Sequence, residues 1–233
     1  MNGFRITLAA GVAAAVACTS AVAHADEETG LAVGLRLGYA IPFGDAQSNT
    51  VNGTSTNVSM ASYQRGWFPF WFDVGYRFTP SIYLGLFYEY GPTFPKSGNC
   101  YVYNPGPAAA GEVTCDGFSQ RLGLAFNYHI RPHELLDPWV GIGIGWEMAQ
   151  LNYAQGASAD TFSFQTWGPE ADLQLGLDLR FSHRIPFGPF VDVSFSEYNT
   201  ESKYNADIQG SDVAFGDRLH GWVTLGVRAQ FDL

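Results

Sequence analysis

The sequence predicts an all-β fold, specifically an eight-stranded antiparallel up-and-down transmembrane β-barrel. Three observations favour this class: stretches of alternating apolar and polar residues recur along the chain, the connections between them alternate between long and short, and a secretory leader precedes them all. Aromatic residues make up 15% of the chain and charged residues 15%, with a mean hydropathy of -0.04. Many aromatics, few charges and no net hydrophobicity are expected where lipid-facing and water-facing side chains alternate.

The final stretch, 220–233, carries this pattern to the last residue. At the two-residue period of a strand, one face is apolar and consists of Val223, Leu225, Val227, Ala229, Phe231 and Leu233. The opposite face is mostly polar and includes Thr224, Arg228, Gln230 and Asp232. On its own, this pattern also suits a strand that covers the core of a soluble sheet. Its recurrence in the chain favours the barrel.

The first 25 residues are predicted to be a signal peptide. Arg5 supplies a positive start, residues 6–18 are apolar, and the A-H-A sequence that ends at residue 25 is a small-x-small cleavage site. The expected mature chain, 26–233, is one domain. A second interpretation makes Cys18 a lipidation site. No other stretch has the roughly 18 consecutive apolar residues of a spanning helix, so a membrane crossing would use strands.

Seven further stretches alternate in the same way as the last one. They are 31–41, 67–78, 82–90, 118–130, 138–148, 170–181 and 187–198. In the first of them, Pro42 is expected to end the pairing because it has no N–H to donate. The aromatics of the apolar faces predict two girdles at the membrane interfaces. The outer girdle is predicted to contain Tyr39, Tyr88, Tyr90 and Trp146, and the inner girdle Tyr76, Phe78, Tyr128 and Phe181.

The connections between these stretches are of two kinds. Four are long and polar and are expected to be extracellular loops: 43–66, 91–117, 150–165 and 197–218. Three are short and are expected to be periplasmic turns: 79–81, 131–137 and 182–186. Long and short connections follow one another strictly, as in single-chain outer-membrane barrels, whereas a β-sandwich does not sort its loops by length.

Two cysteines remain in the expected mature chain, Cys100 and Cys115, and both lie in the second long loop. An exported chain is exposed to oxidising conditions, so a local disulfide between them is expected. Two thiols without a nearby histidine are too few for a metal site.

The inner faces of the predicted strands carry most of the charges. The expected lumen network is Arg36, Asp73, Arg77, Glu89, Arg121, Glu147, Asp172, Asp178, Arg180, Asp192 and Arg228, with Glu170 and Asp232 on the same faces. A barrel of eight strands is only wide enough for side chains to fill it, so these charges are expected to pair as a plug. The alternative is a narrow cation pathway, because eight acids face five arginines.

Three inward glycines, Gly141, Gly143 and Gly145, leave space beside these charges. The space suits either water or the inward aromatic side chains Trp71, Tyr83 and Phe87.

At this level of description the chain resembles the small eight-stranded outer-membrane barrels, which include the OmpA membrane domain and OmpX-like and OmpW-like proteins. The sequence G-Y-A-I-P-F-G-D, 38–45, is similar to the end of the first strand in such barrels. The last strand resembles the signal read by the barrel-insertion machinery, with Phe231 and Leu233 as its key positions, although that signal usually ends in Phe. The resemblance implies the outer membrane of a Gram-negative bacterium. It implies lipid, lipopolysaccharide and the insertion machinery as partners, and a ligand at the outer loops as a further candidate.

The expected function is that of a structural or surface-interaction barrel with a largely filled, charged lumen. The alternative is a small porin or an OmpW-like transporter for small solutes or ions. No enzyme is expected, because His220 is the one histidine predicted at the outer rim and no serine stands beside it on its face. No cofactor or metal is expected either, since the acidic last loop matches no calcium-binding spacing. The net charge of -10 argues against nucleic acid as a partner.

Overall fold

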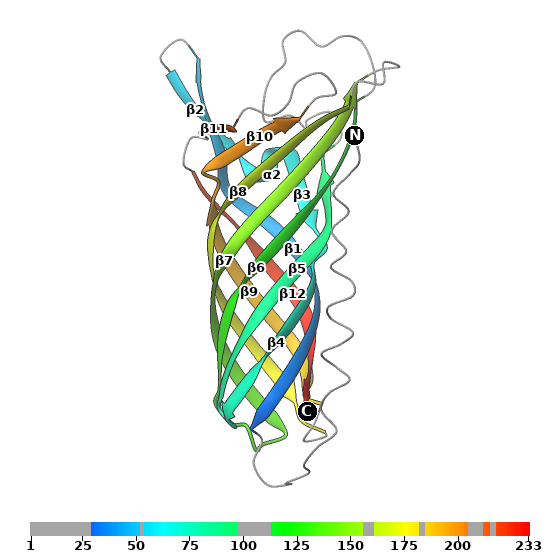
Figure 1. Cartoon of the computed structure of the whole chain (residues 1–233), viewed down its shortest axis with the longest axis vertical. Coiled ribbons are helices and arrows are strands. Elements are labelled where there is room, and N and C mark those ends of the chain that lie inside the picture. Colours follow the sequence, from blue (N-terminus) through cyan, green and yellow to red (C-terminus); the bar gives the residue numbers. More distant parts are fainter. Residues whose placement is uncertain are drawn as a thin grey trace.

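The computed structural model describes residues 29–51, 54–96, 113–155, 161–181, 185–204, 212–214 and 218–233. These residues form a tall barrel of tilted antiparallel strands (Figure 1). The predicted signal peptide, 1–25, lies outside the described residues, so the leader and its cleavage site stay predictions. No described helix has both the length and the apolar character needed to cross a membrane.

Within the described residues, the elements follow one another as twelve strands and one short helix. In order they are β1 (Gly30–Val51), β2 (Thr54–Ser59), α2 (Met60–Tyr63), β3 (Gln64–Trp67), β4 (Phe70–Thr79), β5 (Ile82–Pro95), β6 (Val113–His129), β7 (Leu136–Gln155), β8 (Thr161–Leu179), β9 (Phe187–Glu197), β10 (Thr200–Tyr204), β11 (Asp212–Ala214) and β12 (Leu219–Asp232).

Eight of these strands close into a ring, as the sequence predicts. Each strand from β4 to β9 pairs with the next, β9 pairs with β12, and β1 joins β12 to β4. The closing ladder is long, with Ala32 opposite Asp232 at one end and Gly44 opposite His220 at the other. The ring therefore has no free edge, which a membrane-spanning sheet requires.

Side chains alternate between the two faces of the wall. Apolar residues of the predicted outward faces are exposed, for example Leu122 at 59%, Ile144 at 62% and Leu175 at 59%. Their neighbours Arg121 and Asp192 on the inner face are 1% and 0% exposed. The eight residues of the predicted girdles are all among the exposed large side chains. The predicted lipid-facing pattern is thus confirmed as an outward apolar surface.

The prediction that Pro42 ends the pairing of the first strand is wrong. β1 continues through Pro42, which lies opposite Trp222, and extends to Val51. Between Ala40, opposite Trp67, and Asp45, opposite Ser59, no partner strand pairs with the other side of β1. Pro42 therefore lies on a local edge, where a missing N–H is tolerated.

The predicted strand 67–78 is divided. Phe68 and Pro69 separate β3 from β4, and their backbone bonds depart from the regular ladder: Phe68 N–H donates to Pro92 at 3.0 Å, and Pro69 C=O accepts from Gly38 at 3.3 Å. The proline without an N–H explains the break.

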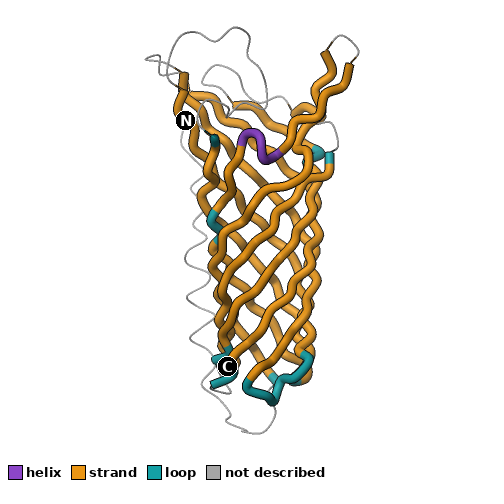
Figure 2. Tube along the Cα trace, turned by 180° about the vertical axis from the view of Figure 1, so that it is seen from behind, coloured by secondary structure: helices purple, strands orange, loops and turns teal. Residues whose placement is uncertain are grey.

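The predicted long loops are also shorter than expected, because strands continue into them. β1 and β2 form a hairpin above the barrel, and β7 and β8 stay paired up to Ala154 and Thr161 (Figure 1). After β2 the chain forms α2 at the same end of the barrel (Figure 2). Later in the chain, β10 pairs with the part of β8 that extends above β9. Hydrogen-bonded pairing persists in water, where no lipid imposes alternation, so polar strands carry no period-two signal.

The opposite end of the barrel is compact. Pro80 and Ser81 connect β4 to β5, and residues 130–135 connect β6 to β7. The C-terminus lies at the same end (Figure 1). We call this end lower and the end with β2 and β10 upper.

A charge at the middle of the outward face should destabilise the barrel more than one at its lower rim. Leu124 lies halfway along the outward face of β6, whereas Leu135 lies in the lower β6–β7 turn. Leu124→Arg is expected to cost roughly 2–4 kcal/mol and Leu135→Arg roughly 0–1 kcal/mol. Urea unfolding in lipid vesicles measures both, and equal costs would contradict the predicted position of the membrane.

Candidate functional site

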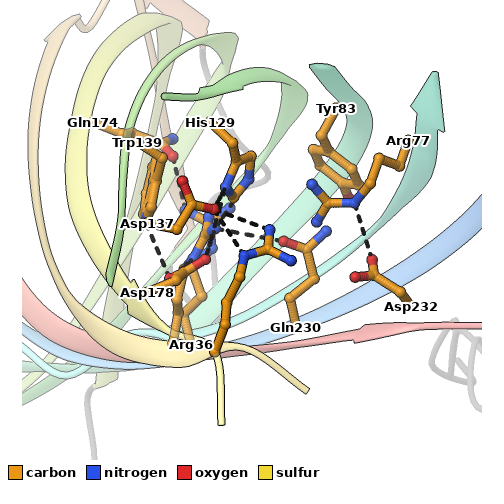
Figure 3. Close-up of polar contacts among 12 residues, drawn as sticks. Arg36, Arg77, Tyr83, His129, Asp137, Trp139, Gln174, Asp178, Gln230 and Asp232 are labelled. Atoms are coloured by element: carbon orange, nitrogen blue, oxygen red, sulfur yellow. Dashed lines mark hydrogen bonds and ion pairs between the residues drawn. The ribbon is translucent and has the colours of Figure 1, made fainter. Parts of the chain in front are cut away.

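The lumen is filled in layers, and the lowest layer is a set of ion pairs. We define the lower cluster as Arg77, His129, Asp137, Asp178, Arg180, Arg228 and Asp232. Arg228 donates two hydrogen bonds to Asp178, from Nη2 to Oδ2 at 2.6 Å and from Nε to Oδ1 at 3.0 Å. Figure 3 labels Arg77, His129, Asp137, Asp178 and Asp232 of this cluster, and Arg77 Nε lies 3.2 Å from Asp232 Oδ1. Two-point Arg–carboxylate pairs are the strongest of such contacts.

The predicted lumen network lacks two residues of this cluster, His129, which lies near the end of a predicted strand, and Asp137. The sequence pattern places it in a turn, but its side chain is fully buried, directly opposite Asp178 in the β7–β8 register. Its carboxylate contacts His129 Nδ1 at 2.6 Å and Arg180 Nη2 at 2.9 Å, and it accepts from the Arg131 backbone N–H at 3.1 Å. Because Asp137 and Trp139 share a face, extending the alternation of β7 by one step would have found it.

A middle layer of aromatic rings lies above the lower cluster. It consists of Trp71, Phe87, Trp139 and Phe190, all at most 3% exposed, with Arg36 among them. The Arg36 guanidinium lies 4.4 Å from the Trp71 ring centre, its Nε is 3.2 Å from Asp73 Oδ2, and its Nη1 donates to Gln174 at 2.7 Å. Arg228 lies 3.7 Å from the Trp139 ring centre and so links this layer to the one below.

Glycines on neighbouring strands leave space for inward side chains. Their partners differ from those expected for Gly141, Gly143 and Gly145. A side chain at Gly143 would collide with the Asp172 carboxylate, and one at Gly123 with the Phe87 ring. Phe87 therefore uses Gly123 rather than the 141–145 glycines, because the register places Gly123 directly opposite it.

The upper cluster is dominated by acids. We define it as Glu89, Arg121, Glu147, Glu170, Asp172 and Asp192. The register places Arg121 opposite Glu89 of β5 and opposite Glu147 of β7. Arg121 Nη1 is 2.7 Å from Glu170 Oε1 and 3.8 Å from Glu89 Oε2, and its Nη2 donates to Ser194 at 2.9 Å. One guanidinium thus lies close to several carboxylates and is the positive charge that they share.

An apolar cap covers the upper cluster. It consists of Met60, Tyr63, Trp67, Tyr198 and Trp222, which pack with Ala40 into one buried group. Tyr198 Oη and Trp222 Nε1 both donate to Glu147 Oε1, at 3.0 Å and 2.9 Å. Burial, followed by the charge of Glu147, raises the pKa of the Tyr198 phenol well above its ordinary value, and the same causes raise the pKa of Tyr63. Both phenols therefore stay neutral, and Tyr198 serves as a hydrogen-bond donor.

Two further groups contain residue types that could carry chemistry, and the first is in the lower cluster. Within the described residues, His129, Asp137 and Asp178 bring potential metal ligands within 4.8 Å of one another. Arg180 and Arg228 already neutralise these carboxylates at 3.0 Å or less, so the geometry fits ion pairs better than a cation.

The other group surrounds His220. Contrary to the expectation that no serine stands beside it, Ser196 lies directly opposite it across the β9–β12 ladder. The Ser196 hydroxyl donates to the Pro169 carbonyl at 3.2 Å, and His220 Nε2 faces Glu147 Oε2 at 3.3 Å. All three side chains are at most 1% exposed, so this group is part of the packed lumen.

The predicted lumen charges are at most 9% exposed, apart from Asp232, whose side chain is 17% exposed. They do not form one mixed network, because the strand registers separate a balanced lower set from an acidic upper set. Cys115 lies on β6, but Cys100 lies outside the described residues, so their disulfide stays a prediction. Phe231 lies opposite Val33, and Leu233 is 66% exposed; their recognition by the insertion machinery also stays a prediction.

Fold and lumen together define a small outer-membrane β-barrel protein with a buried charged interior. Residues 10–173 match the outer membrane protein beta-barrel domain family, and the chain belongs to this family. Its location is accordingly the bacterial outer membrane. No curated protein sequence matches the chain.

The chain is similar to several solved structures of outer-membrane proteins. A major outer membrane protein from Thermus thermophilus is 10% identical over 86% of this chain and 99% of that chain, with a TM-score of 0.52. Neisserial surface protein A is 11% identical over 87% and 97%, with a TM-score of 0.47. OprG from Pseudomonas aeruginosa is 13% identical over 89% and 100%, with a TM-score of 0.47. At such identities the likeness concerns the fold alone.

Removing one partner of a lumen pair should cost far more than removing a surface pair. Arg228→Met leaves Asp178 buried without its two-point partner and is expected to cost about 3–5 kcal/mol of unfolding free energy. The double variant Arg228→Met with Asp178→Asn is expected to recover part of this loss. Arg131→Met breaks the exposed pair with Glu134 and should cost within about 1 kcal/mol. Urea titration of the folded protein measures all three, and equal costs for Arg228→Met and Arg131→Met would contradict the assignment.

Proposed function

We propose that the protein is a membrane-anchored structural or surface-interaction barrel whose lumen is closed to solutes. The observation that carries this proposal is the middle layer, in which four aromatic rings pack together with Arg36 inside the barrel. Eight strands enclose a space only wide enough for such side chains. A solute would have to displace rings from a packed interior, which is costly.

The layers on either side of the middle layer support the same proposal. Below it, paired Arg and Asp residues tie β4, β6, β7, β8 and β12 together across the lumen. Above it, the cap covers the upper cluster with Trp67 and Trp222, whose ring centres are 6.1 Å apart. Charged groups that are buried and paired resist separation, because breaking one pair leaves the other charge without compensation.

The upper extensions supply a surface on which the anchored barrel can bind a ligand outside the membrane. β2, β10 and the upper part of β1 stand above the barrel mouth, beyond the outward apolar surface (Figure 1). We assign the role of ligand contact to this region, with an extracellular protein or lipopolysaccharide as its partner. The proposal includes four further points. The protein is not an enzyme, its short turns face the periplasm, residues 1–25 are cleaved, and the insertion machinery recognises Phe231 and Leu233.

A small porin or transporter for cations is the second candidate, and the upper cluster favours it. Five carboxylates in the lumen would attract cations from the outer side. The path below them, however, meets Arg36 over Trp71 and then Arg228 over Trp139. Two guanidiniums among packed rings oppose the passage of a cation, so we place this candidate second.

Planar bilayer recordings separate the two candidates. The wild-type protein is expected to give no stable single-channel steps, whereas the double variant Trp139→Ala with Phe190→Ala should open a conducting path, because it removes two of the four packed rings. Trp146→Ala is the matched control: its side chain is outward and 52% exposed, and it should leave the lumen closed. Reproducible steps from the wild-type protein would overturn the anchor and favour the porin.

A further inference from the structure

Charge is distributed unevenly along the lumen. The lower cluster contains three arginines and three aspartates, and the middle layer pairs Arg36 with Asp73. The upper cluster contains five buried carboxylates and one arginine. His220 beside Glu147 would add one positive charge when protonated, which still leaves five negative charges against two. Among its described residues, the upper cluster with His220 therefore has a deficit of at least three positive charges, in a place where unpaired charges are costly.

The deficit is concentrated at Glu89 and Asp192, because Glu147 and Asp172 accept hydrogen bonds and Glu170 has a close arginine. Neither oxygen of Glu89 accepts a hydrogen bond within the described residues, and its contact with Arg121 is long, at 3.8 Å. Asp192 is fully buried and lies opposite Gln174 in the β8–β9 register, one inward position away from Asp172. Neither Asp192 oxygen meets a donor among the described side chains.

A neutral oxygen completes this group. Thr224 lies on the inner face of β12, directly opposite Asp192 in the β9–β12 register. Its side chain is 1% exposed, and its hydroxyl has no hydrogen-bond partner in the described structure. An unused buried hydroxyl beside an uncompensated carboxylate is costly unless something binds both.

We propose that the upper lumen is a binding site for one divalent cation of the calcium or magnesium class, formed by Glu89, Asp172, Asp192 and Thr224. Such cations prefer carboxylate and hydroxyl oxygens, and one of them supplies two of the missing positive charges. Among the described residues, the only acidic or histidine group with ligand atoms all within 4.8 Å of one another is the lower triad. The upper oxygens are more widely spaced, so the ion is held partly through its own water molecules, as hydrated divalent sites are.

The site is enclosed at both ends, by the cap above it and by the middle layer below it. Beneath it lies Arg36, whose charge and neighbouring rings oppose further descent. The ion is therefore retained rather than conducted, and its binding does not depend on which partner the upper surface has. It stabilises the barrel by neutralising an acidic interior that the chain itself leaves uncompensated.

Thermal unfolding of the full-length folded protein in an uncharged detergent tests the proposal. Millimolar calcium chloride is expected to raise the unfolding midpoint by roughly 5 °C relative to choline chloride at equal ionic strength, because a ligand at about 100 times its Kd stabilises the folded state by mass action. Asp192→Asn and Glu89→Gln should each unfold at a higher temperature than the wild type in choline and respond less to calcium. Glu134→Gln, the same kind of change at an exposed lower turn, should behave as the wild type does.

Equilibrium dialysis with radioactive calcium alone measures binding directly. About one ion per chain is expected for the wild type and for Glu134→Gln, and at least a tenfold weaker affinity for the Asp192→Asn, Glu89→Gln double variant. Equal binding by the double variant would place the ion elsewhere and overturn the proposal. No calcium response, together with stabilisation on acidification alone, would show that protons neutralise the cluster and would overturn it as well.

Discussion

Backbone hydrogen bonding in hydrocarbon is the constraint on which the rest of this structure depends. A sheet that crosses a membrane cannot leave an edge unpaired, and the ladder between β1 and β12 removes the last one. Closing the ring at eight strands fixes a narrow interior, which side chains fill. The same closure turns every second residue inward, so the charges that lipid excludes are gathered in the lumen.

The charges gathered in the lumen are buried and must be paired or neutralised. The chain achieves this in the lower half with Arg–Asp pairs, such as the two-point contact of Arg228 with Asp178, and in the middle with Arg36 on the Trp71 ring. The upper half contains an excess of carboxylates beneath an apolar cap that α2 helps to form. This polarity along the barrel axis explains why a barrel that we propose to be a closed anchor still resembles a cation pathway when its inward residues are merely counted.

The membrane-spanning part could be predicted from the sequence, because lipid and lumen impose opposite chemistries on successive residues such as Arg121 and Leu122. The upper extensions and α2 could not, because strands in water need no such alternation. Asp137 escaped prediction because the alternation was stopped one step too early. The separation of the acidic upper cluster from the balanced lower cluster depends on which inward residues face one another, as Arg121 faces Glu89 and Glu147. These pairings follow from the strand registers, which are set only when the ring closes.

The central claim is that water-soluble molecules cannot pass the middle layer. Ala125 is fully buried and packs with the four rings of this layer. In a protein with Cys100 and Cys115 replaced by serine, Ala125→Cys should resist a small charged thiol reagent while folded and react after unfolding, whereas Leu135→Cys in the exposed lower turn should react in both states. Rapid labelling of Ala125→Cys in the folded barrel would contradict the account, because it would show a water-filled path through the layer.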